Sequence, residues 1–300
     1  MFLQQLINGF TLGAVYALIA LGYTMVYGIL ELINFAHGEI YMLGAYITII
    51  SLSILTITGL TSKSLILSLL IVLIITTIIS GAYGLTMERA AYRPLRHAPR
   101  LSPLISAIGV SIFLQNYVML TQGSADKIFP HILPPGGLSM ADVTLTYMQM
   151  FIIITSVFLM TALHTFIRKT RLGKAMRATA QDKKMASLVG IDIDTVIMVT
   201  FITGSALAAV AGFMVAMYYG LVNFYMGYVA GIKAFTAAVL GGIGNIQGAV
   251  FGGFLLGILE SLGAAYISSE YKDAFAFIIL ILILIFKPTG LLGERVPEKV

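Results

Sequence analysis

The chain has 300 residues, of which 59% are hydrophobic and 10% are charged, and its formal net charge is +5. A soluble domain carries about 45 to 50% apolar and about 25% charged residues, so this composition excludes an ordinary soluble globular protein. The sequence contains no cysteine, which excludes disulfides, thiolate metal sites and cysteine nucleophiles. Its apolar residues come in long unbroken runs, as is typical of an integral membrane protein.

Apolar runs long enough to cross a bilayer follow one another along the chain. A span needs about 20 residues, because the hydrocarbon core is about 30 Å thick and a helix rises about 1.5 Å per residue. The first run lacks a basic n-region and a small-residue cleavage site, so we expect it to be retained. The candidate spans are residues 6–30, 33–57, 64–87, 104–121, 148–167, 195–219 and 249–267, with a weaker one at 221–240 and a short one at 274–286.

These runs predict an all-α membrane protein that forms a single transmembrane domain over residues 1–300. The predicted architecture is a polytopic helix bundle with about 8 to 10 membrane segments, some of them interrupted or re-entrant.

The second run opens with polar residues that membrane spans rarely contain. Asn34, His37 and Glu39 lie within one and a half helical turns, and Asn34 and His37 would share a helix face. An ionisable group in a membrane is by default a functional candidate that faces the interior of the bundle. We therefore expect these three residues to line a translocation path or to form a gate, and the alternative is a satisfied structural network. A catalytic or metal-binding histidine is disfavoured, because no nucleophile or second ligand lies at a recognisable spacing.

Residues 122–147 interrupt the apolar pattern with Pro130, Pro134, Pro135 and two adjacent glycines. These turn residues exclude a continuous helix. A loop of this length often binds something, although a solvated connector is an equally good interpretation.

Lysine and arginine are concentrated in three parts of the chain, residues 89–100, 168–184 and 287–299, which hold fourteen of the 18 basic residues. The positive-inside rule places all three in the cytoplasm. The N-terminus and residues 122–147 are then on the side of the membrane opposite the cytoplasm, and the C-terminus is cytoplasmic. This distribution suits anionic lipid headgroups, so we expect the lipid bilayer and no nucleic acid as a partner.

Residues 168–194 are too polar to span a membrane and too patterned for a simple linker. The stretch from Ala175 to Val189 contains no glycine or proline, and Gly190 stands where a helix C-terminus favours glycine. We expect one short amphipathic helix here, whose small residues would fit a cleft on a partner. For any single basic residue, the positive-inside rule is a sufficient explanation.

The region after the sixth long run is rich in glycine. Gly248 and Gly252, and likewise Gly253 and Gly257, form small-xxx-small pairs that favour close helix packing, with direct substrate contact as the alternative. A phosphate loop is excluded, because no Gly-Lys-Ser/Thr sequence follows.

Two features link distant parts of the sequence. Lys233 and Glu260 are charged residues in apolar surroundings that could pair, although snorkelling of Lys233 to the outer interface is the simpler interpretation.

An Asn-Phe pair after a Tyr-Gly pair occurs both near Asn34 and near Asn223, which suggests an internal repeat of the kind found in transporters.

Several motifs together resemble one known family nearly from end to end. They include residues 8–13 (NGFTLG), 23–28 (YTMVYG), 33–39 (INFAHGE), 92–94 (YRP), 184–188 (KMASL), 233–244 (KAFTAAVLGGIG) and 288–290 (PTG). On these motifs the chain is identified as a member of the high-affinity branched-chain amino-acid permease family, H-type subunit.

The resemblance implies an ATP-driven importer of leucine, isoleucine and valine in the bacterial inner membrane. Its partners would be a second homologous permease subunit, two ATP-binding subunits and a periplasmic amino-acid-binding protein. The chain itself would be a transport subunit with no catalytic residue, metal or cofactor, because the partner subunits would bind ATP. The coupling residues would be Arg171, Gly173, Arg177, Asp182 and Gly190 in the cytoplasmic segment.

Two other functional classes are consistent with parts of the sequence. An ion-coupled secondary transporter would need a mid-membrane site, for which His37, Glu39 and Glu260 are the candidates. The basic cytoplasmic segment favours the ATP-driven importer. An intramembrane enzyme ranks last, because the chain lacks the His-Glu-x-x-His and Gly-x-Ser-x-Gly motifs.

Overall fold

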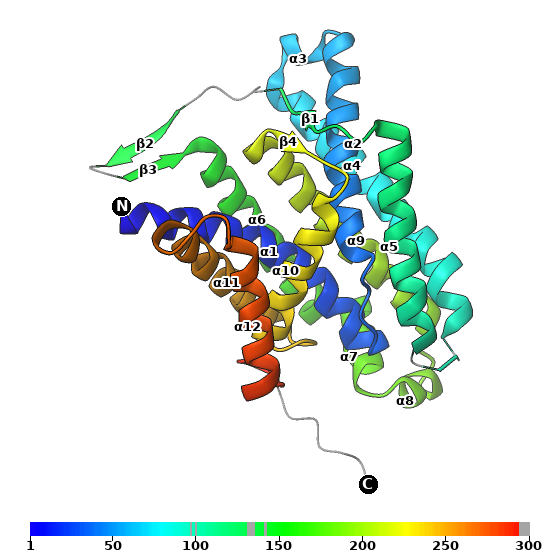
Figure 1. Ribbon diagram of the computed structural model, residues 1–300. Coiled ribbons are helices and arrows are strands. Elements are labelled where there is room, and N and C mark those ends of the chain that lie inside the picture. The colour runs from blue at the N-terminus through cyan, green and yellow to red at the C-terminus, as the bar shows by residue number, and fades with distance from the viewer. Residues whose placement is uncertain (97, 100, 131–135, 141–142, 294–300) are drawn as a thin grey trace.

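Helices make up most of the computed structural model, which describes residues 1–96, 98–99, 101–130, 136–140 and 143–293 (Figure 1). The helices are α1 (Phe2–Leu30), α2 (His37–Ile57), α3 (Leu60–Lys63), α4 (Leu65–Met87), α5 (Leu101–Gln122), α6 (Tyr147–Lys169), α7 (Arg171–Gln181), α8 (Lys183–Leu188), α9 (Ile193–Tyr219), α10 (Met226–Gly241), α11 (Ile246–Tyr266) and α12 (Lys272–Phe286). A π-helical turn (Glu88–Tyr92) and a 3₁₀ turn (Arg93–Leu95) extend α4.

Seven helices in the described part of the chain are long and apolar enough to cross a membrane, namely α1, α2, α4 with its extension, α5, α6, α9 and α11. Two further apolar helices are shorter, α10 with 16 residues and α12 with 15. Each of the nine corresponds to one of the predicted runs. The polytopic all-α bundle expected from the sequence is therefore confirmed.

The described residues between α5 and α6 form no helix, as the turn residues of this segment predicted. The segment contains β1 (Lys127–Ile128), β2 (Gly137–Met140) and β3 (Val143–Thr146). β2 and β3 form an antiparallel hairpin, and β1 pairs antiparallel with β4 (Leu221–Val222) after α9. Pro134 and Pro135 lie outside the described residues.

Helix α1 forms the centre of the bundle and packs against α9, α10 and α11. In the 18-residue apolar stretch of α1, 83% of the residues are buried inside the chain. The corresponding share is 22% for α5 and 28% for α6. The peripheral helices therefore present apolar side chains outward. Surfaces of this kind are stable in contact with lipid tails or with another membrane subunit.

Glycines bring α11 close to two neighbours at once. A Cβ atom on Gly257 would lie 2.3 Å from the backbone nitrogen of Gly13 in α1, and one on Gly252 would lie 2.1 Å from the carbonyl oxygen of Ala237 in α10. One glycine pair of α11 thus faces α1 and the other faces α10. The close-packing interpretation of these pairs is confirmed.

Two helix boundaries differ from those predicted. α2 begins at His37 instead of residue 33, so Asn34 precedes the helix and does not share a helix face with His37. The short amphipathic helix expected around residues 175–189 is present as α7, but its predicted extent is wrong, because α7 ends at Gln181 and a second helix, α8, begins at Lys183. The break occurs at Asp182, whose Oδ1 accepts hydrogen bonds from the backbone nitrogens of Lys184 and Met185 at 2.9 and 3.0 Å. Aspartate favours this N-cap position over a helix interior.

The repeated Asn-Phe motif adopts the same local structure in both places. Asn34 Oδ1 accepts a hydrogen bond from the nitrogen of Ala36 at 3.0 Å, and Asn223 Oδ1 accepts one from the nitrogen of Tyr225 at 3.0 Å. In each copy a new helix begins three residues after the asparagine. The sequence echo therefore corresponds to a repeated turn that starts α2 in one copy and α10 in the other.

The described parts of the three basic segments lie at one end of the bundle. Figure 1 shows α7, α8, the α4–α5 connection and the C-terminal end of α12 at the end opposite α3. The same end carries most of the lysines and arginines that the positive-inside rule assigns to one side of a membrane.

Candidate functional site

The N-terminal ends of α2 and α10 meet inside the bundle. A Cβ atom on Gly38 would lie 2.3 Å from the carbonyl oxygen of Gly227, and one on Gly227 would lie 2.8 Å from the carbonyl oxygen of Gly38. From this crossing α2 rises and α10 descends in the view of Figure 1. The positive ends of two helix dipoles therefore point into one small region.

Glu39 is the acidic residue at this crossing and is only 1% exposed. Its Oε1 accepts a hydrogen bond from Ser111 Oγ on α5 at 3.0 Å. Its Oε2 has no hydrogen-bond partner among the described residues. This oxygen lies close to Gly227, since a Cβ atom built on Gly227 would be only 2.5 Å from it. Two helix N-termini and one hydroxyl give a buried carboxylate a favourable place in an otherwise apolar bundle.

Asn34 and His37 are fixed on the other side of the crossing. Asn34 Oδ1 accepts a second hydrogen bond from Tyr92 Oη at 2.7 Å, which ties the turn before α2 to the extension of α4. The His37 ring packs edge-on against Tyr23, with 4.9 Å between ring centroids, and fills the space left by Gly22. Both residues are 1% exposed. The structure thus brings all three predicted residues together, at a turn and a helix start instead of along one span.

Ion pairs that we did not predict join the α4–α5 connection to the start of α9. Arg96 bridges Glu88 and Asp194, and Arg93 also pairs with Asp194. Asp192 caps α9, and a hydrogen bond from the Thr195 hydroxyl lowers the pKa of its carboxyl group. The sequence did contain a signal for these contacts, since Asp192 and Asp194 stand at the start of an apolar run. Acidic residues are favoured at a helix N-terminus, where they can also pair with a nearby basic loop.

The five predicted coupling residues occupy different environments at the end of the bundle that holds α7 and α8. Arg171 and Arg177 are exposed. Gly173 is buried against the end of α6, where a Cβ atom would lie 2.3 Å from the carbonyl oxygen of Ile167. Asp182 caps α8, and Gly190 has φ +84° with open space around it. Gly190 thus has the left-handed conformation expected after a helix. Gly173 packs against α6 of the same chain and is not free to contact a partner.

An exposed apolar tip lies at the end of α8. Met185, Leu188 and Val189 are 62%, 79% and 76% exposed. Ala186 is buried, so the small-residue face that we predicted is partly used within the chain. The tip sits beside Lys184 and is the most prominent apolar feature of this segment.

Lys233 and Glu260 form an ion pair inside the bundle, with 2.6 Å between Nζ and Oε1. Lys233 also pairs with Asp273 at 2.5 Å, and Glu260 Oε2 accepts a hydrogen bond from Tyr16 Oη at 2.9 Å. Lys233 is 4% exposed. Pairing is therefore the correct interpretation, and snorkelling of Lys233 is wrong.

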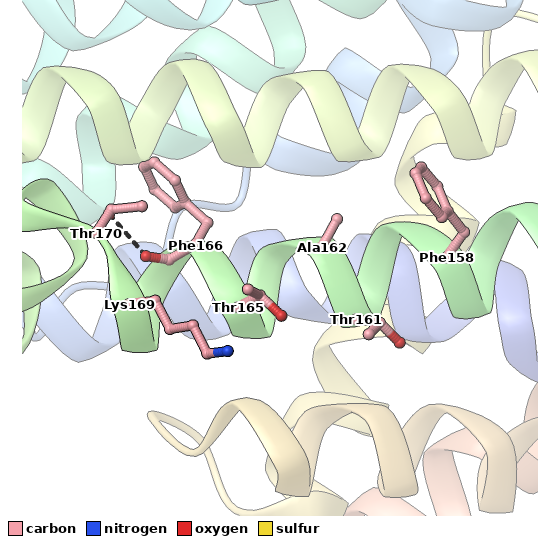
Figure 2. A pocket seen from close by; sticks show the side chains of 7 residues that line it. All are labelled: Phe158, Thr161, Ala162, Thr165, Phe166, Lys169 and Thr170. Atoms are coloured by element: carbon pink, nitrogen blue, oxygen red, sulfur yellow. Dashed lines mark hydrogen bonds between the residues drawn. The ribbon is translucent and has the colours of Figure 1, made fainter.

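A shallow groove on the outer face of α6 has a volume of about 470 Å³. Figure 2 shows Thr161, Thr165 and Lys169 pointing to one side of the helix, with Phe158 and Phe166 on the other. One helix and the residue that follows it supply the whole lining, which is mostly apolar. The groove therefore lacks the converging polar groups of a binding site. Within the described residues, no group of three histidine, aspartate or glutamate side chains could hold a metal ion.

The family model and the curated proteins that match this chain describe the same kind of protein. Residues 5–284 match the family model described as branched-chain amino acid transport system / permease component. The chain is 52% identical over 303 residues to the high-affinity branched-chain amino acid transport system permease protein BraD of Pseudomonas aeruginosa, covering 100% of this chain and 98% of that protein. LivH of Escherichia coli K12 is similar to the same extent. A probable LivH of Methanocaldococcus jannaschii is 28% identical over 92% of this chain. No solved structure matches the chain significantly.

Proposed function

Because this chain belongs to the family of permease components of branched-chain amino acid transport systems, we propose that it carries leucine, isoleucine and valine across the bacterial inner membrane. The observation that supports this most strongly is identity of 52% over the full chain with BraD and LivH. A multi-pass bundle with an apolar outer surface agrees with that role.

The proposed assembly contains a second homologous permease subunit, two ATP-binding subunits and a periplasmic amino-acid-binding protein. The weakly buried faces of α4, α5 and α6 suit contact with lipid or a second membrane subunit. ATP would be bound by the partner subunits, so we propose no cofactor in this chain. The N-terminus would be periplasmic and the C-terminus cytoplasmic, as the shared end of the basic segments suggests.

The segment of α7 and α8 is the proposed contact with the ATPases. Its exposed tip at Met185, Leu188 and Val189 would enter an apolar cleft, and the exposed Arg171 and Arg177 would add charge contacts. α7 packs against α6, α1 and α9, and Lys183 Nζ donates a hydrogen bond to the carbonyl oxygen of Leu30 at 3.4 Å. The tight contact of Gly173 with α6 would pass a displacement of α7 to the membrane bundle.

The crossing of α2 and α10 is the proposed gate. Asn34, His37 and Glu39 are buried inside this chain, which favours a gate over an exposed path wall. Hydrogen bonds from Tyr92 and Ser111 tie this crossing to the α4 extension and to α5. A relative movement of these helices would therefore change the crossing, as alternating access requires.

The function can be tested in cells that lack this gene, with and without its restoration. We expect loss and rescue of labelled leucine uptake at submicromolar concentration, with competition by isoleucine and valine but not by a sugar. The proposed substrates would be contradicted if the restored leucine uptake were inhibited by a sugar and not by isoleucine.

A further inference from the structure

A cavity of about 330 Å³ lies between α1, α9, α11 and the start of α12. Its volume falls in the range of small-molecule sites, about 300 to 1,000 Å³. It lies where the N-terminal half of α1 runs beside the C-terminal half of α11. Under the proposed topology, this is the periplasmic half of the bundle. The cavity is thus placed where a solute would enter the membrane domain.

One side of the cavity carries neutral hydrogen-bonding groups. Asn8 Oδ1 accepts a hydrogen bond from Gln149 Nε2 on α6 at 2.9 Å, and the same nitrogen lies 3.3 Å from Tyr218 Oη on α9. Ser261 Oγ on α11 donates to the carbonyl oxygen of Gln5 at 2.9 Å. Polar groups from several helices are costly inside a membrane bundle unless they are satisfied or used. Asn8, Tyr218 and Ser261 are satisfied by these bonds within the bundle, and all three line the cavity.

Charges of both signs also line the cavity. Glu260 is 4% exposed, so it belongs to the floor, whereas Lys272 is exposed and belongs to the rim. Lys233 holds one oxygen of Glu260 and Tyr16 holds the other. A carboxylate has about four lone-pair positions, so Glu260 can accept further hydrogen bonds from a ligand ammonium group. Lys272 can meet a ligand carboxylate at the rim.

The remaining lining consists of Tyr219, which is 56% exposed, and three smaller apolar side chains. Leu12 comes from α1, and Ala264 and Ala265 come from α11. An aliphatic side chain of a few carbons suits this surface, because it loses water without leaving polar groups unpaired. A sugar would place hydroxyl groups against the same apolar wall and is disfavoured.

We infer that this cavity is a subsite for a zwitterionic α-amino acid with an aliphatic side chain, occupied on the way through the membrane domain. The inference rests on the proposed function and adds a place within this chain where the substrate itself is recognised. The ammonium group lies toward Glu260, the carboxylate toward Lys272, and the side chain against Leu12 and Ala264.

The test narrows the cavity and compares two substrates that differ by one methylene group. The complete transporter is reconstituted with Ala264→Phe, and uptake of leucine and valine is measured separately. We expect leucine uptake to fall about tenfold more than valine uptake, which is the size of effect that one methylene group has in an apolar pocket. Ala265→Phe is the second variant, because Ala265 lines the same cavity and is exposed, so its replacement does not disturb the core.

Ala162→Phe is the matched control, since it makes the same substitution in the groove on α6, away from the cavity. We expect it to leave the valine-to-leucine ratio unchanged. An unchanged ratio in both cavity variants, with an active wild-type transporter, would overturn the subsite alone. A wild-type transporter that moves neither amino acid would instead contradict the proposed function, and with it this inference.

Discussion

Gly38 and Gly227 touch through their backbones at the point where α2 and α10 begin, and neither position has room for a side chain. These two glycines also stand four residues after Asn34 and Asn223, the two asparagines that shape the repeated turn. The contact therefore joins equivalent positions of the two repeated turns at the centre of the bundle.

Replacing Gly38 with alanine is expected to destabilise the chain. The added Cβ would lie 2.3 Å from a carbonyl oxygen, and backbone atoms cannot move aside as a flexible side chain can. Overpacking of this kind costs about 1 to 3 kcal/mol. Thermal unfolding of the purified protein in detergent measures the effect. Gly109→Ala on α5 is the control, because nothing lies within 4 Å of a Cβ there. Equal unfolding temperatures for the two variants would contradict the close contact.

The buried ion pair predicts strong coupling between Lys233 and Glu260. Lys233→Met leaves a carboxylate in the bundle without its cation, which costs about 3 to 5 kcal/mol in a buried pair. Glu260→Gln should cost less, because Lys233 keeps its ion pair with Asp273. The double variant should recover part of the loss caused by Lys233→Met, because Glu260 is then no longer a buried carboxylate without its cation, and Asp273 is partly exposed to water. A double-mutant cycle on unfolding free energies measures this coupling, and additive losses would show that the residues act independently.

The hydrogen bond from Tyr92 to Asn34 should stabilise the turn before α2. Tyr92→Phe removes the donor at 2.7 Å and leaves the amide oxygen of Asn34 with one partner in a buried site. We expect a loss of about 1 to 2 kcal/mol in the free energy of unfolding. Tyr266→Phe, at a residue that is 60% exposed, is the comparison and should have little effect. If the two substitutions cost the same, the bond to Asn34 does not hold this turn.

Gly190 provides a test of coupling that does not depend on overall stability. Its φ of +84° is unfavourable for a β-branched residue, and its surroundings are open, so Gly190→Val should distort the end of α8 locally. We expect ATP hydrolysis by the assembled transporter to continue while leucine uptake falls severalfold. Gly190→Asn is the matched variant, since asparagine tolerates the left-handed region, and it should retain most of the coupling. Normal uptake by the valine variant would count against a docking role for this segment.

The sequence was informative wherever one physical constraint dominated. The length of apolar runs predicted the membrane helices, including the short α10 and α12, because a bilayer sets the length of its spans. Turn residues likewise predicted the irregular segment between α5 and α6.

Other features depend on tertiary contacts that no local pattern contains. The break at Asp182 was missed because the surrounding stretch has no glycine or proline, although its aspartate is an equally good helix start. The partner of Lys233 became clear only when α10, α11 and α12 were packed together. Asn34, His37 and Glu39 all lie near the contact of α2 with α10, and their arrangement there depends on this tertiary contact.

The most direct test of the proposed function is leucine uptake into proteoliposomes that contain the complete transporter, with the amino-acid-binding protein outside and ATP supplied to the ATPases. We expect uptake to require both ATP and the binding protein, to be unaffected by an ionophore that collapses ion gradients, and to be competed by isoleucine and valine. Uptake that continues without ATP and disappears when the ion gradient is collapsed would contradict the ATP-driven importer and would favour an ion-coupled transporter instead.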